Sequence, residues 1–236
     1  MTKRFGFTLA EVLITLGIIG VVAAMTMPTL MNSTQDAQYK TAYKKALSAL
    51  SQAVTLNVAL DGSSFADVVA GTAGKTDKPS NGDSVASILG ARMNVVNVAS
   101  SATAAGYTSF PGTLGQAKSC KESGKQIGDE GCTVQTTTDI SPDTFLFFND
   151  GIMFAFGSDA AACTDDSTTA TVKHCAGIID VNGVKGPNKL VSCDKNTGTS
   201  SVACKVSNPT DIYPVVFYDQ TVLPASDPAK VVLYSK

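Results

Sequence analysis

The stretch FTLAEVLITLGIIGVVAAMTMPTL, residues 7–30, contains one ionisable side chain, that of Glu11. It follows residues 1–6, which include Lys3 and Arg4. At about 1.5 Å per helical residue, the run can cross a bilayer core of about 30 Å. Because the basic residues precede it, we expect residues 1–6 to stay in the cytoplasm and the rest to be exported. An ionised group in hydrocarbon costs roughly 2.5–3.5 kcal/mol on insertion scales, so Glu11 needs a partner.

The start of this run resembles a known processing signal. Gly6 followed by Phe7-Thr8-Leu9-Ala10-Glu11 and an apolar helix is similar to the type III signal of type IV pilins and type II secretion pseudopilins. The resemblance implies cleavage by a prepilin peptidase/methyltransferase between Gly6 and Phe7, N-methylation of the Phe7 amine, and retention of the helix. It also implies assembly through pairing of Glu11 with the terminal amine of a neighbouring subunit. An ordinary membrane anchor with a tolerated Glu11 is the alternative.

The same resemblance carries expectations about function, partners and location. It implies a structural subunit, a pilin, of a type IV pilus-like filament. The alternatives are a pseudopilin of a type II secretion system and a minor tip pilin acting as an adhesive or binding module. The implied partners are further copies in a helical homopolymer, other pilins, and an inner-membrane assembly platform with a cytoplasmic ATPase. The implied location is the bacterial inner membrane for the single-pass precursor, then an extracellular filament at the cell surface or a periplasmic pseudopilus.

The apolar run is expected to continue into one long helix. Pro28 lacks an amide hydrogen and Gly20 weakens helical backbone, so we expect a kink between them. Beyond Pro28, apolar residues recur at spacings of three and four, which predicts an amphipathic helix to about Leu60 that ends near Asp61-Gly62. These apolar residues are Tyr39, Tyr43, Leu47, Leu50, Val54 and Val58.

The remaining sequence predicts an antiparallel sheet. Residues 144–148 and 152–156 are apolar and flank Asn149-Asp150-Gly151, a strong hairpin signal. Further strands are expected at 176–181, 213–218 and 231–234, with Pro214 at the start or edge of its strand. Asp83-Ser84 is expected to cap a helix carrying Val85, Ile88, Leu89, Met93 and Val96, while 71–82 and 100–115 are expected loops. The predicted fold is α+β and pilin-like, with a long protruding N-terminal helix packed on the sheet.

These signals divide the chain into five expected parts. Residues 1–6 form a leader peptide, 7–30 the transmembrane and polymerisation half of the helix, and 31–60 its amphipathic half. Residues 61–139 connect the helix to the sheet. Residues 140–236 hold the antiparallel sheet and a disulfide-bonded C-terminal region.

Six cysteines lie in the part expected to be exported: Cys120, Cys132, Cys163, Cys175, Cys193 and Cys204. Export to an oxidising space favours disulfides. The regular spacing of successive pairs favours three local bridges, although six cysteines allow 15 connectivities. The absence of closely spaced pairs disfavours zinc.

One segment raises the question of a metal. Residues 180–188 (DVNGVKGPN) are similar to a segment of a subset of pilin-like proteins. Asp180 and Asn182 alternate as at the start of a calcium loop, and Asn188 and Asp211 could add oxygens. Turns built on Asn-Gly and Gly-Pro explain these residues without a metal and are the favoured interpretation, with calcium as the alternative.

Composition narrows the function classes. The chain has 236 residues, one histidine, no tryptophan and a net charge of −2, so strong electrostatic binding of nucleic acid is not expected. An imperfect phosphate-loop sequence, 69–76, has Val69 where the first glycine belongs, and adjacency of His174 to Cys175 does not make a nucleophile pair. We therefore do not expect an enzyme.

Overall fold

The fold comes from a computed structural model that describes residues 8–70, 84–108, 110, 142–164, 175–195 and 203–235, without the side chains at 28, 29 and 31–33. The chain divides into two compact units, Met1–Gln38 and Tyr39–Lys236. Helix α1, Leu9–Asp61, begins in the first unit and ends in the second. It is helical throughout, including at Gly20 and Pro28, and the expected kink stays a prediction.

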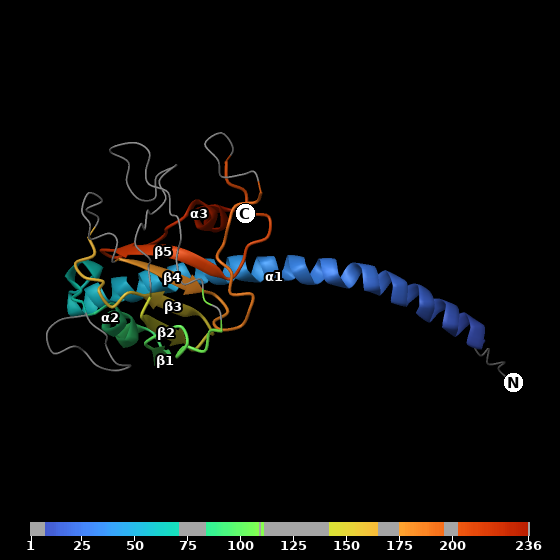
Figure 1. Cartoon of the computed structure of the whole chain (residues 1–236), viewed down its shortest axis with the longest axis horizontal. Coiled ribbons are helices and arrows are strands. Elements are labelled where there is room, and N and C mark those ends of the chain that lie inside the picture. The colour runs from blue at the N-terminus through green and yellow to red at the C-terminus, as the bar shows by residue number, and fades with distance from the viewer. Residues whose placement is uncertain are drawn as a thin grey trace. The chain divides into compact units, whose positions relative to one another are not determined.

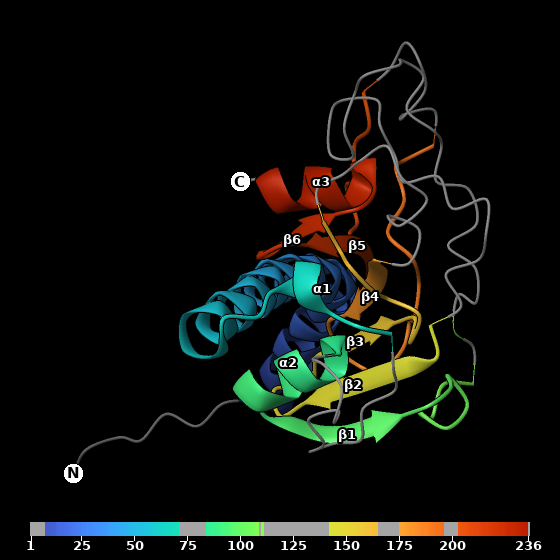
Figure 2. The same ribbon diagram turned by 90° about the vertical axis from the view of Figure 1, so that its left-hand side faces the viewer.

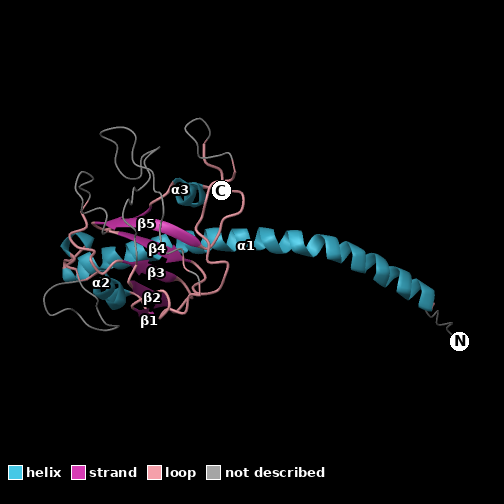
Figure 3. Cartoon of the chain, in the orientation of Figure 1, coloured by secondary structure: helices cyan, strands magenta, loops and turns pink. Residues whose placement is uncertain are grey.

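Among the residues that the structure describes, the second unit contains a six-stranded antiparallel sheet in the order β1-β2-β3-β4-β5-β6. Each strand therefore pairs with its neighbours in sequence. Figures 1 and 3 label β1 to β5, and Figure 2 also labels β6. The strands are β1 Val95–Ala99, β2 Thr144–Phe148, β3 Met153–Phe156, β4 Ala176–Asp180, β5 Ile212–Tyr218 and β6 Thr221–Pro224. The other elements of this unit are the 3-10 turn η1 Phe65–Asp67, α2 Val85–Arg92 and α3 Asp227–Tyr234, which lies beside β6 (Figure 2).

One face of the sheet packs against α1 and α2. Tyr43 and Leu50 of α1 are fully buried in the same cluster as Phe154 and Phe217 of the sheet. The ring of Tyr43 stacks on Tyr213 of β5 at a centroid distance of 3.9 Å. The apolar stripe predicted on residues 39–58 is thus the face of α1 that packs on the sheet. The sheet buries the apolar side of this amphipathic helix.

The opposite face of the sheet is also buried. Its cluster contains Phe145, Met153 and Ile178, together with Tyr107 from the segment after β1. Because both faces are covered, β3 and β4 are buried at every position. This explains why their sequences are continuous apolar runs rather than alternating ones.

Local sequence signals set several boundaries as predicted. Helix α1 ends at Asp61, and Gly62 follows with φ +76°, a conformation that favours glycine. Ser84 caps α2 through a reciprocal pair of hydrogen bonds with Ser87. Strands β2 and β3 pair across the Asn149-Asp150-Gly151 turn, where Gly151 has φ +85°. The α+β, pilin-like fold class is confirmed.

Two expected elements are wrong. The helix after Ser84 ends at Arg92, so Met93 and Val96 are not in it, and residues 95–99 form β1 instead. Branched side chains at Val95 and Val96 favour extended backbone, and pairing with β2 rewards it. The apolar run 231–234, expected as a strand, belongs to α3. Ser226 caps that helix by accepting a hydrogen bond from the Ala229 amide.

The expectation for Pro214 is partly wrong, and strand β6 was not foreseen. Pro214 is the third residue of β5, which lies between β4 and β6 rather than at the sheet edge. Its carbonyl accepts from Ala225, just past the end of β6. In an antiparallel strand the N–H and C=O of a residue point to the same side, so the missing N–H of Pro214 falls where the ladder ends.

A tight contact in the sheet gives a first prediction. A Cβ added at Gly177 of β4 would lie 2.7 Å from the ring of Phe154 and 2.8 Å from the carbonyl oxygen of Ala155. We expect Gly177→Ala to lower the free energy of unfolding by about 1–3 kcal/mol through overpacking. Thermal unfolding of the detergent-solubilised chain, followed by tyrosine circular dichroism, measures this. Gly20→Ala is the matched control, since a Cβ there meets nothing within 4 Å, and equal melting temperatures for both variants would contradict the packing argument.

Candidate functional site

The first candidate is the apolar start of α1. Residues Leu9–Met27 have a mean hydropathy of 2.2, are long enough to cross a membrane, and bury none of their length within the chain. Large side chains such as Leu13, Ile14 and Ile19 are more than half exposed. A surface of this kind is not stable in water, so it requires lipid or protein around it. The apolar helix and its N-terminal position fit a membrane-anchored precursor.

Glu11 sits at the beginning of this segment in a defined local geometry. Thr8 precedes the first residue of α1, and Glu11 lies three residues later. The Glu11 carboxylate accepts hydrogen bonds from the Thr8 amide at 2.9 Å and the Thr8 hydroxyl at 2.8 Å, while the Thr8 hydroxyl oxygen accepts from the Glu11 amide at 3.3 Å. This is a capping box, which satisfies two amides at the helix start. Sequence analysis missed this role, although the Thr-x-x-Glu spacing signals it.

Both donors of the cap bond one carboxylate oxygen of Glu11, Oε2, and they leave the charge of the carboxylate uncompensated. Thr8 contributes dipoles only, and residues 7–30 contain no lysine or arginine. A cation for Glu11 must therefore come from outside this segment's side chains. The Phe7 amine that cleavage would create is one such group, but Gly6 and Phe7 lie outside the described residues.

In the second unit, two lysines of α1 make specific contacts with the body. Lys45 forms an ion pair with Asp150 in the β2–β3 turn at 2.7 Å. Lys44 donates to the carbonyl of Ser235, just after α3, at 2.9 Å. These two lysines therefore connect α1 to the β2–β3 turn and to the residue that follows α3.

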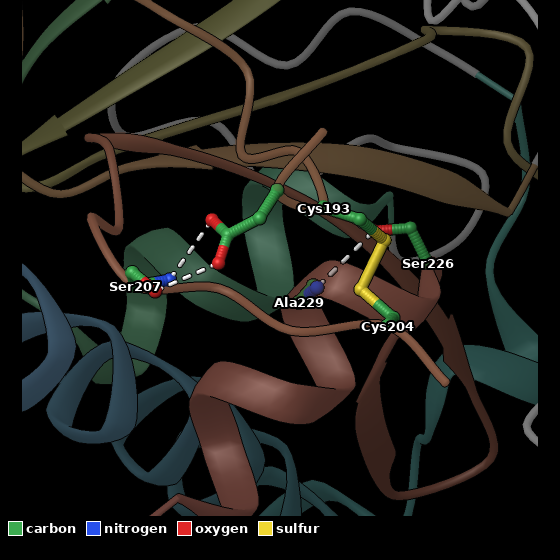
Figure 4. Close-up of a disulfide and its surroundings, with 6 residues drawn as sticks. Cys193, Cys204, Ser207, Ser226 and Ala229 are labelled. Atoms are coloured by element: carbon green, nitrogen blue, oxygen red, sulfur yellow. Dashed lines mark hydrogen bonds between the residues drawn. A yellow bond between two sulfur atoms is a disulfide. The ribbon is translucent and has the colours of Figure 1, made fainter. Parts of the chain in front are cut away.

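The C-terminal region is closed by disulfides. Cys163 pairs with Cys175, and Cys193 pairs with Cys204. Both are pairings of sequence neighbours, while Cys120 and Cys132 lie outside the described residues. Beside the second bridge, Asp194 accepts hydrogen bonds from the amide and hydroxyl of Ser207 (Figure 4). The disulfide and these hydrogen bonds hold residues 193 and 194 next to residues 204 and 207.

The four residues considered for calcium meet at one loop. Asp180 accepts from the Asn182 amide at 3.1 Å and from the Tyr107 hydroxyl at 2.8 Å. Asp211 accepts from the amides of Asn188 and Lys189 at 2.7 and 2.8 Å. Both aspartates are completely buried. Their carboxylates thus organise the turn by binding backbone and hydroxyl donors.

These donors supply an alternative to a metal. Every oxygen of the two carboxylates already accepts an N–H or O–H, whereas calcium takes six to eight oxygen ligands. Among the described residues, no group of three or more His, Cys, Asp or Glu side chains could hold a metal ion. Asn182 Oδ1 is buried without a hydrogen-bond donor, which is the one feature here that suits a cation or a water. Turns without a metal stay the favoured interpretation of these residues, and calcium stays the alternative.

Tyr107 is the second residue that the sequence did not reveal. It comes from the segment 100–115, which was expected to be an unremarkable loop, yet it is buried and its ring lies 4.9 Å from Phe110. Its partnership with Asp180 spans 73 positions, and no short-range pattern indicates such a contact.

The burial of Asp180 makes stability depend on pH. Burial raises the pKa of Asp180 to about 7, with hydrogen bonds from Tyr107 and Asn182 opposing the shift and Asp211 adding to it. A raised pKa means that the folded state holds a proton that the unfolded state releases near pH 4. The contribution to stability is therefore full below about pH 4 and is lost as the pH rises to about 7.

We expect Asp180→Asn to flatten the fall of the free energy of unfolding between pH 4 and 7, measured by denaturant titration of the solubilised chain. Asp194→Asn is the matched control. Hydrogen bonds from Ser207 lower the pKa of Asp194. The effect of this group on stability is therefore confined to pH values below about 4, and its variant should keep the wild-type fall in the free energy of unfolding between pH 4 and 7. A wild-type slope in Asp180→Asn would refute the assignment.

Comparison with known proteins supports the N-terminal signal. A family model described as the prokaryotic N-terminal methylation motif matches residues 1–27. No curated protein and no solved structure matches the chain. The match covers the segment that holds Gly6, Phe7, Thr8 and Glu11, and it supports a protein of the type IV pilin or pseudopilin class. The chain carries the prepilin-type signal of type IV pilins and pseudopilins.

Proposed function

We propose that the chain is a structural subunit of a type IV pilus-like filament, processed after Gly6 and assembled through its N-terminal helix. The observation that carries this proposal is the exposed apolar segment Leu9–Met27 with Glu11 as its one ionisable group. A segment that only anchors the chain in a membrane has no use for a carboxylate at Glu11. A contact between subunits can use this carboxylate, because the terminal amine of a partner can neutralise its charge.

The physical basis is a difference between two environments. In the membrane, Glu11 has hydrogen bonds from Thr8 but carries an unpaired charge, which is unfavourable in hydrocarbon. Beside the cleaved amine of another copy, the charge is paired in a low-dielectric setting. The relief of this penalty depends on one relative position of the two chains, so it favours one axial register in the polymer.

The alternatives in the same class differ in where the chain acts. A type II secretion pseudopilin would build a periplasmic filament, and its deletion would block release of secreted proteins. A minor tip pilin would be present in few copies, and immunogold labelling would find it at filament ends. Labelling along the shaft supports the proposed main subunit.

The role of the Glu11 charge can be separated from its role as a cap. Glutamine at the third helical position also completes a capping box, so Glu11→Gln should keep the helix start but lose the charge. We expect this variant to insert into the membrane and to be processed normally. Its amount in sheared filaments should be at least about tenfold lower than that of wild type, which corresponds to a loss of about 1.4 kcal/mol of contact free energy. Immunoblots of sheared and cell-bound fractions measure both quantities.

Thr8→Ser is the matched control, because it keeps the hydroxyl that bonds Glu11 and should assemble normally. Filaments of Glu11→Gln at wild-type abundance would show that the cap suffices and that charge pairing does not drive assembly.

Processing is tested separately at the cleavage site. Gly6→Ala should accumulate a precursor that retains residues 1–6, since the resemblance places the scissile bond after Gly6. Mass spectrometry of the membrane fraction reads the N-terminus directly, and the wild-type product should begin with N-methylated Phe7. A wild-type product that begins at Met1 would contradict the proposed maturation.

A further inference from the structure

The loop after β4 is hydrogen-bonded at both of its ends to buried carboxylates of the body. Asp180 anchors its start through the Asn182 amide, and Asp211 anchors its end through the amides of Asn188 and Lys189. Within the loop, the Asn182 side-chain amide donates to the Gly186 carbonyl at 3.2 Å. Two completely buried carboxylates therefore fix both ends of a short stretch of exposed chain.

What this loop presents to its surroundings is apolar and basic. Val184 is 45% exposed, and Lys185, Pro187 and Lys189 are also exposed. A loop that is already fixed loses little conformational entropy when it binds, which is the usual advantage of preorganised recognition segments.

The chain that follows extends the basic character. The amide of Asp194 donates to the carbonyl of Lys205 at 2.7 Å, and the Cys193–Cys204 bridge closes the same loop. Lys195 and Lys205 are exposed there. We call residues 182–195 and 203–207 the basic segment. The sequence from 182 to 207 has four lysines and one acidic residue, Asp194.

The rest of the chain has the opposite charge. After Gly6, and outside residues 182–207, there are 12 basic and 19 acidic residues, and two of these acidic residues, Asp180 and Asp211, are buried and do not contribute to the surface. Charge is therefore separated along one polypeptide, with a short basic segment on a predominantly acidic remainder. Such a distribution lets one copy attract another copy through unlike surfaces.

We propose that the basic segment is a docking surface for the acidic surface of a second copy of this chain. This inference rests on the proposed filament function and adds a contact between the exported bodies to the contact made by the helices. Two unlike surfaces on one chain can form a head-to-tail contact between copies. Such a contact generates an open helical filament unless the rotation between copies closes a ring. That is the symmetry that a filament requires.

The test reverses charge on the rigid loop of the full-length chain in cells. We expect Lys185→Glu with Lys189→Glu to lower the yield of sheared filaments on the order of tenfold at about 0.15 M salt, because attraction at these positions becomes repulsion. Wild-type filaments should also dissociate more readily as salt increases, since screening weakens the same attraction. Both quantities are measured by sedimentation and electron microscopy.

Two matched variants isolate the cause. Lys185→Arg with Lys189→Arg keeps the charge of the basic segment and should give the wild-type yield of filaments. Lys230→Glu on α3 changes the net charge outside the basic segment and should also give the wild-type yield. Tyrosine circular dichroism of each solubilised variant checks that the body is folded. Wild-type filament yield and salt response in the double Glu variant would overturn the proposal, as would an equal loss in Lys230→Glu.

The outcome is distinguishable from failure of the proposed function. If the wild-type chain is not cleaved after Gly6 or forms no filaments, the proposed function fails. If wild-type filaments form and the double Glu variant matches them, only the docking surface is refuted. Loss of binding to another target with filament yield intact would also count against this proposal and would favour an adhesive role for the loop.

Discussion

The central constraint on this protein is a carboxylate in an apolar helix whose own segment offers no cation. Glu11 is hydrogen-bonded by Thr8, and this is sufficient to begin a helix but not to neutralise a charge. Every other feature of residues 9–27 is compatible with a simple anchor. On the proposed function, this charge is paired by the terminal amine of a second chain, and the position of the carboxylate near the helix start suits such a contact.

The second half of the same helix solves a different problem. From Tyr39 onward, α1 supplies the buried stripe that covers one face of the sheet, with Tyr43 stacked on Tyr213. Lys44 bonds the end of α3, and Lys45 pairs with Asp150 in the β2–β3 turn. One continuous helix thus joins a segment that needs an external environment to a segment whose environment is supplied by its own chain.

The sequence predicted those features that depend on short-range patterns. Periodicity located the buried stripe of α1, the Asn-Asp-Gly turn located β2 and β3, and even cysteine spacing favoured the local bridges at 163–175 and 193–204. The sequence did not predict features that depend on contacts between distant segments. Strand β1 is stabilised by pairing with β2, and Tyr107 is important because its hydroxyl donates to the buried Asp180. The C-terminal run 231–234 was misassigned since a short apolar run suits either structure, and Ser226 decided in favour of the helix.

The buried aspartates and the exposed Glu11 of this chain differ in where their hydrogen-bond donors come from. Asp180 and Asp211 take their donors from separate segments of the folded body, and burial raises the pKa of Asp180 enough to reduce its charge near neutral pH. Their needs are met within one molecule, and the result is a rigid exposed loop. Glu11 takes both of its donors from a single residue at the end of a helix, with no packed structure around it to share or remove the charge. On the proposed function, the first arrangement prepares a surface for a partner, while the second is incomplete until a partner arrives.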